Sequence, residues 1–262
     1  MQLGRSGLLA LTLALPLGAQ QQTQPVKDLP DEAGFASIFD GKSLAGWEGD
    51  PKFWRVENGA IVGEIAPGNE IRENTFLIWR GGPAKGVARD FELKLEYRIS
   101  ERGNSGINYR SLVVAGKPFV LQGYQFDIDG PLKNAAPTRH TGNNYDEKGR
   151  TFMALRGQVT RATSGGARQV IGSLGDYAEM AKLVRDDWNS VHLIARGNTM
   201  VHLLNGQVMS ILVDDDEMNR AIEGLLAVQV HTGPPMKVEF RNVRLKESVA
   251  EPIIRRIDRS ER

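Results

Sequence analysis

The sequence predicts an all-β protein, a two-layer jelly-roll sandwich. Many short segments alternate apolar and polar residues, as half-buried strands do. Turn dipeptides recur between these segments, and 29 of the 262 residues are glycine. Regular hairpins at this spacing are typical of a sandwich or jelly roll, and the length suits one large β domain once an N-terminal leader is set aside.

The ends of the chain predict three segments outside that domain. Arg5 is followed by the apolar run Leu8–Leu17 and by Gly18-Ala19, which is the pattern of a secretory signal peptide over 1–19. The run is shorter than the roughly 20 residues that span a bilayer, so we expect no membrane insertion after signal removal. A buried N-terminal helix is the alternative. A linker over 20–34, the domain over 35–247 and a charged tail over 248–262 complete the division.

Charge and cysteine usage narrow the partners and the compartment. The 33 Lys and Arg nearly balance the 32 Asp and Glu, which gives no electrostatic reason to expect nucleic acid or a membrane surface as a partner. The chain has no Cys, which excludes a disulfide framework and a lipidated N-terminal Cys. With the signal peptide, these features predict a protein secreted to a periplasm or beyond.

The strands follow from local patterns. Asn58-Gly59 supplies the positive φ angles of a type I′ turn, so Phe53–Glu57 and Ala60–Glu64 form a hairpin. Phe91–Ile99 shows the clearest alternation, and Asp176 is placed to cap a short helix within 176–184. The other expected strands are Thr75–Trp79, Gly106–Ser111, Gln122–Asp129, two within 158–173, Trp188–Arg196, Thr199–Leu204, Gln207–Val213, Leu225–Thr232 and Lys237–Lys246.

Three of these strands carry an unusual polar face opposite their apolar face. The polar pairs are Asn108 with Arg110, Gln125 with Asp127, and Gln229 with His231. If the three strands belong to one curved sheet, its concave outer face carries a carboxylate, an imidazole, a guanidinium and several amides. Amides with charged groups suit a hydroxyl-rich ligand such as a sugar, because they both donate and accept hydrogen bonds.

The loop 130–150 follows one of these strands and contributes further candidates. It shows little periodicity, and structureless loops of that length inside a domain are usually functional or disordered. Tyr145 and Arg150 are its candidate ligand-binding residues. Asp129, just before Gly130, is most easily a turn residue.

Simpler interpretations stay open for the polar residues. Asp127 could pair with Arg110 in a structural ion pair, and His231 could be a structural histidine, as we expect for the other hairpin histidines. Gln125 and Gln229 could be ordinary residues of a solvated sheet face.

No spacing resembles a zinc box, a P-loop or a nucleophile elbow, so no cofactor is certain. Glu64 ends a strand before a Pro-Gly loop, where it is either solvated or lines the site. A divalent metal held by Asp127, His231 and Glu64 is conceivable, but these ligands are scattered along the chain.

Eight segments, taken in order, resemble the 3-keto-disaccharide hydrolase family. The resemblance covers Phe35 to about Lys246. The segments are FASIFDGKSLAGW, WRVENGAIVGE, NSGINYRS, GYQFDIDG, TGNNYDEKGR, WNSVHLIARGN, HLLNGQ and LAVQVHTGPPMKVEFRNVRLK.

The resemblance implies a concanavalin A-like or LamG-like jelly roll, secreted, acting on glycosides oxidised at C3 of a sugar. A C3 ketone acidifies the C2 proton, so a general base can form an enolate that expels the C1 oxygen, after which water adds to the enone. On this view Asp127 or His231 is the base, and Arg110 stabilises the enolate. Tyr145 or Glu64 assists the leaving group.

Further residues would bind hydroxyl groups of a small carbohydrate: Gln125, Gln229, Asn108 and Arg150. Relatives often have a His-Gly pair where this chain has His231-Thr232-Gly233, so the substrate can differ. The competing functions are a lectin-like binding module without chemistry and, third, a scaffold that binds no sugar. The sequence does not distinguish one-step hydrolysis from elimination followed by hydration. It also does not give the oligomeric state.

Overall fold

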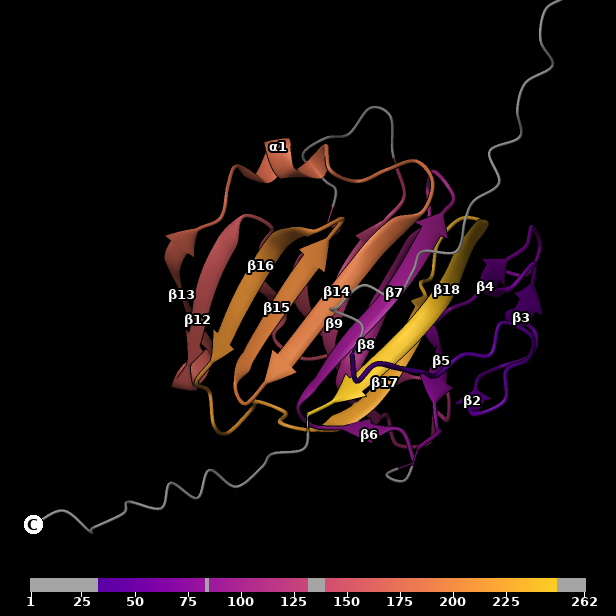
Figure 1. Ribbon diagram of the computed structural model, residues 1–262, viewed down its shortest axis with the longest axis horizontal. Helices are drawn as coiled ribbons and strands as arrows, with labels where there is room; N and C mark the ends of the chain where they lie inside the picture. Colours follow the sequence, from indigo (N-terminus) through magenta and orange to yellow (C-terminus); the bar gives the residue numbers. More distant parts are fainter. Residues whose placement is uncertain (1–32, 83–84, 132–139, 249–262) are drawn as a thin grey trace, which may run out of the picture. The chain divides into compact units, whose positions relative to one another are not determined.

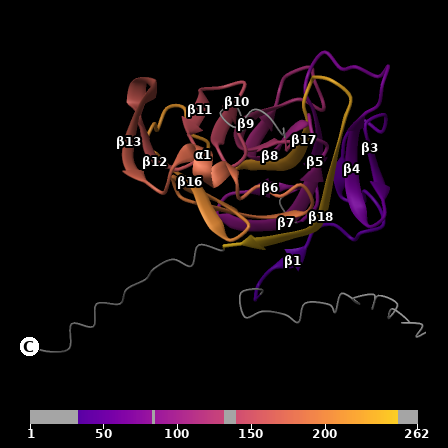
Figure 2. The same ribbon diagram turned by 90° about the horizontal axis from the view of Figure 1, so that it is seen from above.

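The computed structural model describes residues 33–82, 85–131 and 140–248. The expected signal peptide over 1–19, nearly all of the linker and nearly all of the charged tail lie outside these residues. From Gly34 onward the described chain forms two sheets packed face to face (Figure 1, Figure 2). The predicted all-β jelly-roll sandwich is confirmed.

The first sheet forms the face nearer the viewer in Figure 1. All its neighbouring strands are antiparallel except β12 and β16, which run parallel. Its order is β13 (Ala167–Ser173), β12 (Gln158–Thr163), β16 (Gln207–Asp214), β15 (Thr199–Leu204), β14 (Asn189–Arg196), β7 (Phe91–Ile99), β18 (Met236–Glu247), β4 (Ala60–Ile65) and β3 (Trp54–Glu57), with β1 (Ala36–Ser37) on β18.

The second sheet is entirely antiparallel and holds the strands with unusual polar faces. Its order is β11 (Thr151–Ala154), β10 (Asn144–Glu147), β9 (Leu121–Asp129), β8 (Asn104–Val113), β17 (Gly224–Val230), β5 (Thr75–Trp79) and β2 (Trp47–Glu48), with β6 (Val87–Ala88) on β17. The helix α1 (Tyr177–Ala181) begins after Asp176, which accepts hydrogen bonds from the amides of residues 178 and 179 as predicted.

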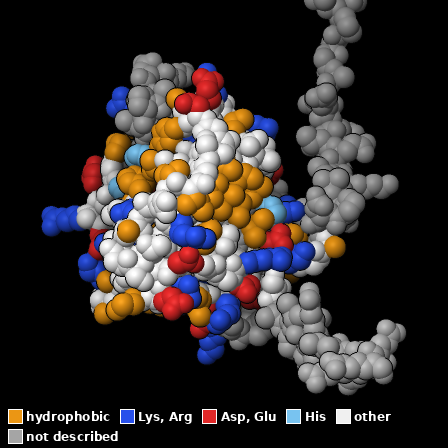
Figure 3. All heavy atoms as spheres, turned by 90° about the vertical axis from the view of Figure 1, so that its left-hand side faces the viewer, with side chains coloured by type: hydrophobic (Ala, Val, Ile, Leu, Met, Phe, Trp, Pro, Cys, Tyr) orange, Lys and Arg blue, Asp and Glu red, His pale blue; other side chains and the backbone are white. Residues whose placement is uncertain are grey.

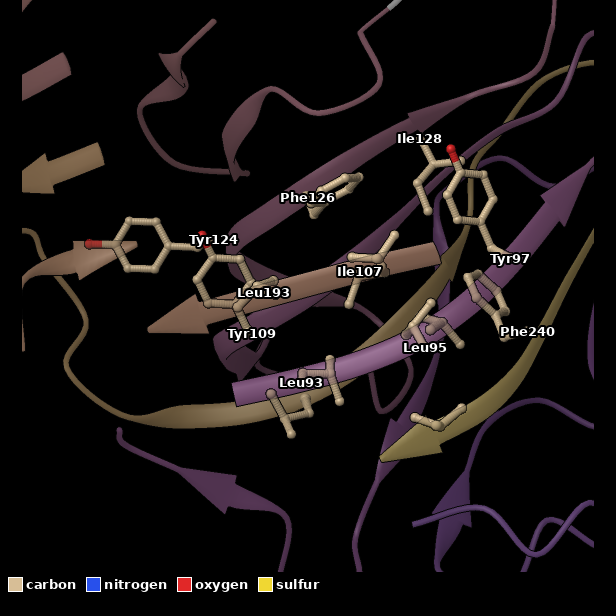
Figure 4. Packing of buried hydrophobic residues seen from close by; sticks show 14 of the residues in the cluster. Leu93, Leu95, Tyr97, Ile107, Tyr109, Tyr124, Phe126, Ile128, Leu193 and Phe240 are labelled. Carbon is tan, nitrogen blue, oxygen red and sulfur yellow. The ribbon is translucent and has the colours of Figure 1, made fainter. Parts of the chain in front are cut away.

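The core between the sheets follows from the alternation along the strands. Leu93, Leu95 and Tyr97 of β7 point inward, while the residues between them are partly exposed. They meet side chains of β8 and β9 from the opposite sheet (Figure 4). The turn at Asn58-Gly59 has φ angles of 52° and 78°, both positive as a type I′ turn requires.

A second apolar cluster covers part of the outer face of the second sheet. Phe76 and Ile78 of β5 and Ala227 of β17 pack there against the chain that joins β8 to β9, including Val114 and Val120. This half of the face is therefore closed, and the polar side chains of β8, β9 and β10 lie beside it.

Within the loop 130–150, the described residues 140–150 include a strand that the sequence did not predict. Asn144–Glu147 forms β10, which pairs with β9 through Tyr145 and Gln125. The strand was missed because its inward residues are polar: Asn144 Nδ2 donates to the Tyr109 hydroxyl, and the Asp146 carboxylate accepts from Arg150. Without an apolar face, a four-residue strand gives no period-two signal.

The edge strand β13 is largely exposed. Val170 and Ile171 are 56% and 46% exposed. Figure 3, which views the molecule from the β13 side of Figure 1, shows hydrophobic side chains gathered on this face.

Candidate active site

The register of the second sheet brings the polar faces of three strands together. Asp127 of β9 lies opposite Gly106 of β8, and Gln125 lies between Asn108 and Tyr145. The backbone of His231, just after β17, donates to the Asn104 carbonyl of β8. A cavity of about 190 Å³ lies at this place, lined by Asn104, Gln125, Asp127, Asp129, His140, Tyr145, Glu147, Phe152 and His231.

A chain of side-chain hydrogen bonds holds the floor of this cavity. Gln125 Nε2 donates to Asp127 Oδ1 at 2.8 Å, and Gln229 Nε2 donates to Gln125 Oε1 at 3.0 Å and to Glu147 Oε2 at 3.5 Å. A Cβ atom on Gly106 would lie 2.3 Å from the Gln125 side chain. Glycine at 106 therefore leaves the space in which Gln125 reaches its partners.

Asp127 carries the most perturbed carboxyl group of the cavity. It is 8% exposed, and burial raises its pKa well above the ordinary value, because the anion loses its hydration. The hydrogen bond from Gln125 opposes this rise, and the charges of Asp129 and Glu147 add to it. No described residue donates to Asp127 Oδ2, so this oxygen is available to a bound molecule.

Asp129 and His140 form a second polar pair beside Asp127. Asp129 Oδ2 accepts from the His140 amide at 2.7 Å and lies 3.5 Å from His140 Nδ1. Burial raises the pKa of Asp129, while the His140 amide and the nearby charges of His140, His231 and Arg156 oppose the rise. The expectation that Asp129 only turns the chain is wrong, because its side chain lines the cavity.

His231 and Tyr145 stand on opposite sides of Asp127. His231 Nδ1 lies 2.6 Å from the Thr232 carbonyl oxygen, which can only accept, so Nδ1 carries a proton and Nε2 of the neutral ring is an acceptor. Burial and the carboxylates of residues 147, 127 and 146 raise the pKa of Tyr145, so its hydroxyl stays protonated near neutral pH and can donate.

Aromatic rings form one wall of the cavity. The centroid of Phe152 lies 5.1 Å from that of Tyr145 and 5.2 Å from that of His140. Phe152 is 37% exposed, so it offers a ring surface to a ligand. An apolar wall beside amides and carboxyl groups suits a sugar, which has both C–H and hydroxyl surfaces.

Residues 34–246 match the model of the 3-keto-α-glucoside-1,2-lyase-like domain. The chain belongs to this family. A curated relative, the 3-keto-disaccharide hydrolase of Bacteroides thetaiotaomicron, is 26% identical over 189 residues, which is 68% of this chain and 58% of the relative. The chain thus spans little more than half the length of that relative.

Solved structures agree on the fold of this 3-keto-α-glucoside-1,2-lyase-like domain. A putative glycosyl hydrolase from Parabacteroides distasonis superposes with a TM-score of 0.53 at 15% identity, covering 82% of this chain and 99% of that one. A protein of unknown function with a galectin-like fold from Bacillus subtilis gives 0.52 at 11% identity, covering 79% and 92%. In the described part of the chain, no helix is long and apolar enough to cross a membrane.

Arg110 is not part of the cavity, and its expected position beside Asn108 is wrong. Its φ of 46° marks an irregularity where the pairing of β8 with β9 and β17 shifts register, which breaks the alternation. The guanidinium, 1% exposed, instead donates to the carbonyl oxygens of Arg89 at 2.7 Å and Gly197 at 2.7 Å and pairs with Asp90. It cannot form the alternative ion pair with Asp127.

Glu64 and Arg150 are also placed elsewhere. Glu64 lies on β4 of the first sheet and pairs with Arg55 at 2.6 Å, so it is a solvated surface residue, not a residue of this cavity. Arg150 follows the turn after β10 and pairs with Asp146 at 2.8 Å and Asp214 at 2.7 Å. It borders a neighbouring cavity instead.

Asn108 and Gln229 support the floor and do not line the cavity. Both are fully buried. Both amide atoms of Asn108 and Oε1 of Gln229 have no hydrogen-bond partner among the described residues. Gln229 acts on the cavity through Gln125.

The three metal candidates are not brought together, because Glu64 lies on the other sheet from Asp127 and His231. Over residues 33–82, 85–131 and 140–248, no group of three or more His, Cys, Asp or Glu side chains could hold a metal ion. A divalent metal remains a prediction from the sequence alone.

Several residues that line or support the cavity were not among the predicted site residues. Glu147 follows Tyr145 at a spacing of two and could have been found by recognising β10. Asn74 donates to Glu147 Oε1 at 3.1 Å and accepts from the Thr232 amide at 2.9 Å, which ties the ends of the floor together. Nothing local in the sequence marks Asn74, since its partners are distant in the chain; the other missed residues are Asn104, His140 and Phe152.

Proposed function

We propose that this protein cleaves 3-keto-glycosides, with Asp127 as the base that removes the C2 proton. Membership of the family and the name of the Bacteroides relative support a glycoside-cleaving activity. The observation that carries the proposal is the buried Asp127 carboxyl, held at one oxygen by Gln125 inside a polar cavity with an aromatic wall.

The environment of Asp127 suits proton uptake. Because burial favours its neutral form, the carboxylate gains stability when it accepts a proton from C2 of the sugar. The C–H electron pair forms the C2=C3 bond of an enolate, which then re-forms the ketone and expels the oxygen at C1. Water adds across the resulting C1=C2 bond to give the free 3-keto sugar.

Other cavity residues serve the oxygens of the substrate. With Arg110 bound elsewhere, the donors for the developing C3 oxyanion are the Tyr145 hydroxyl and the imidazole of His140. His231 Nε2 is an alternative base, and Tyr145 can instead protonate the leaving oxygen. The exposed ring of Phe152 packs against the sugar C–H surface.

We also propose that the protein is exported, on the strength of the signal-peptide pattern over 1–19. N-terminal sequencing of the mature protein from a periplasmic fraction should begin near Gln20. An unprocessed N-terminus in the cytoplasmic fraction would contradict export.

Turnover tests the enzymatic proposal. Purified protein is incubated with 3-keto-trehalose or another 3-keto-glucoside, with and without chelator, and release of the leaving sugar is followed by chromatography. We expect release by the unaltered protein and loss with Asp127→Asn. A chelator-sensitive rate would support the predicted divalent metal.

A lectin-like binding module is the second candidate, favoured by the exposed Phe152 ring beside the amides. It predicts that 3-keto-glycosides bind without release of a product. Sugar binding that persists in Asp127→Asn and His231→Ala, with no turnover by any variant, would replace the enzymatic proposal.

A further inference from the structure

A second cavity of about 220 Å³ adjoins the first at one end of β8, β9 and β10. Its walls include Leu112 of β8, Gln122 and Gly123 of β9, and Asn219 from the segment after β16. Glu147 is common to both cavities.

The spacing along the strands places the two cavities side by side. Gln125 lines the first cavity and Gly123 the second, and residues two apart on a strand face the same side about 7 Å apart. On β10, Tyr145 and Glu147 repeat this relation, and Glu147 lies opposite Gly123. The second cavity therefore begins on the same face of the sheet, two residues farther along each strand than the floor of the first.

Gly123 keeps the surface beside Glu147 free of a side chain. Its φ is 137°, and a Cβ there would lie 2.8 Å from the Ser111 backbone. A larger residue would have to shift the backbone where the two cavities meet.

The volume of the first cavity leaves part of a glycoside outside it. At about 190 Å³ it lies below the roughly 300–1,000 Å³ of pockets that bury larger ligands, so it accommodates about one sugar ring. A glycoside also carries a leaving group at C1, which must occupy adjacent space.

We propose that the second cavity is the subsite for the leaving group and that it accepts a neutral, hydroxyl-rich group, such as a second sugar ring. This rests on the proposed cleavage of 3-keto-glycosides. The cations that line it are paired, Arg150 with Asp146, Lys148 with Glu73 at 3.0 Å and Arg110 with Asp90, so none is left to attract an anion. The Glu147 carboxylate accepts from the Asn74 amide and can accept from a hydroxyl group of a neutral ligand.

The lining also disfavours an aromatic leaving group. Gln122 is exposed, and its amide makes no hydrogen bond to any described residue. The amide can therefore both donate a hydrogen bond to a sugar hydroxyl and accept one from it. Leu112, 58% exposed, offers an apolar surface to C–H groups. Tyr124 is the aromatic residue among the described lining and is only 1% exposed, which leaves little ring surface for stacking.

Two variants and two substrates test the subsite. Gln122→Ala removes the amide, and Leu112→Trp fills the cavity from its rim; both positions are exposed, so folding should be preserved. Gln169→Ala, on the exposed strand β13, is the control. The substrates are a 3-keto-disaccharide and the methyl 3-keto-glucoside of the same anomeric configuration, which lacks a second ring.

We expect Gln122→Ala to raise KM for the disaccharide about 3- to 10-fold, the effect of one lost hydrogen bond. Leu112→Trp should raise it at least as much, because the larger ring occupies space that the second sugar needs. Neither variant should change KM for the methyl glycoside. Equal effects on both substrates, or no effect on either, would overturn the subsite. Calorimetric titration of the same ligands in an Asp127→Asn background measures binding without turnover. Weaker binding of the disaccharide alone, with unchanged binding of the methyl glycoside, would support the subsite. Failure of the unaltered protein to cleave either substrate would refute only the proposed function.

Discussion

Replacing Asp127 by Asn should make the protein less active and, at neutral pH, more stable. Asn keeps an oxygen at the Oδ1 position, so the hydrogen bond from Gln125 survives. The variant no longer has to bury an ionised carboxylate. The raised pKa of Asp127 shows that this burial destabilises the unaltered protein.

The size and sign of the stability change follow from proton linkage. Between pH 3.8, the ordinary value for Asp, and the higher native pKa, the folded protein holds a proton on Asp127 that the unfolded chain has lost. The stability of the unaltered protein therefore falls by about 1.4 kcal/mol per pH unit across this interval, relative to Asp127→Asn. The advantage of the variant should vanish near pH 3.8, grow as pH rises, and level off above the native pKa.

Urea unfolding at several pH values between 4 and 9 measures this difference directly. Asp40→Asn is a control of opposite sign, because amides of Ser43 and Lys42 lower the pKa of exposed Asp40 to about 2. That variant should lose stability at neutral pH. Activity of Asp127→Asn should fall by about 10²- to 10⁴-fold. A stability difference independent of pH, or a variant less stable throughout, would refute the raised pKa of Asp127.

Three further substitutions separate the roles of the surrounding residues. Gly106→Ala should displace Gln125 and lower kcat by about 10- to 100-fold in steady-state assays, with circular dichroism unchanged; wild-type kinetics would show that this contact does not matter. Arg110→Met should lower the free energy of unfolding by about 3–5 kcal/mol in urea, because its buried partners lose a donor, while kcat of the folded fraction holds; lost kcat with unchanged stability would return Arg110 to the active site. Asn74→Ala should release Glu147 and raise KM roughly fivefold, and an unchanged KM would argue against that link.

The alternation of apolar and polar residues predicted much of the fold and part of the cavity, because each strand shows this pattern in its own sequence. A strand shows which of its residues share a face, so Gln125 and Asp127 could be paired from sequence, and so could Gln229 and His231. Their adjacency across strands was an inference, which the register of β9, β8 and β17 supports.

Backbone irregularity limited the prediction for Arg110. Counting by two assigns it to the face of Asn108, but the positive φ and register shift send its guanidinium toward Arg89 and Gly197. Arg has no special preference for that conformation, so its sequence context carries no signal of the irregularity.

Long-range contacts account for the other missed residues. Asn74 precedes β5 and Glu147 ends β10, so only the folded sheet brings their side chains to 3.1 Å. Glu64 was predicted to line the site, but its strand belongs to the other sheet. Its position near the end of a strand gives no information about which sheet the strand joins.

Deuterium at C2 of the product tests the central claim most directly. The reaction is run in D₂O with an unlabelled 3-keto-glycoside, and the released 3-keto sugar is analysed by NMR at early times against an enzyme-free sample of the same sugar. If Asp127 removes the C2 proton before C1–O cleavage and water then adds to the enone, the released sugar carries solvent deuterium at C2 from the first turnover. Released sugar that retains its original C2 hydrogen would contradict proton abstraction and indicate direct hydrolysis at C1.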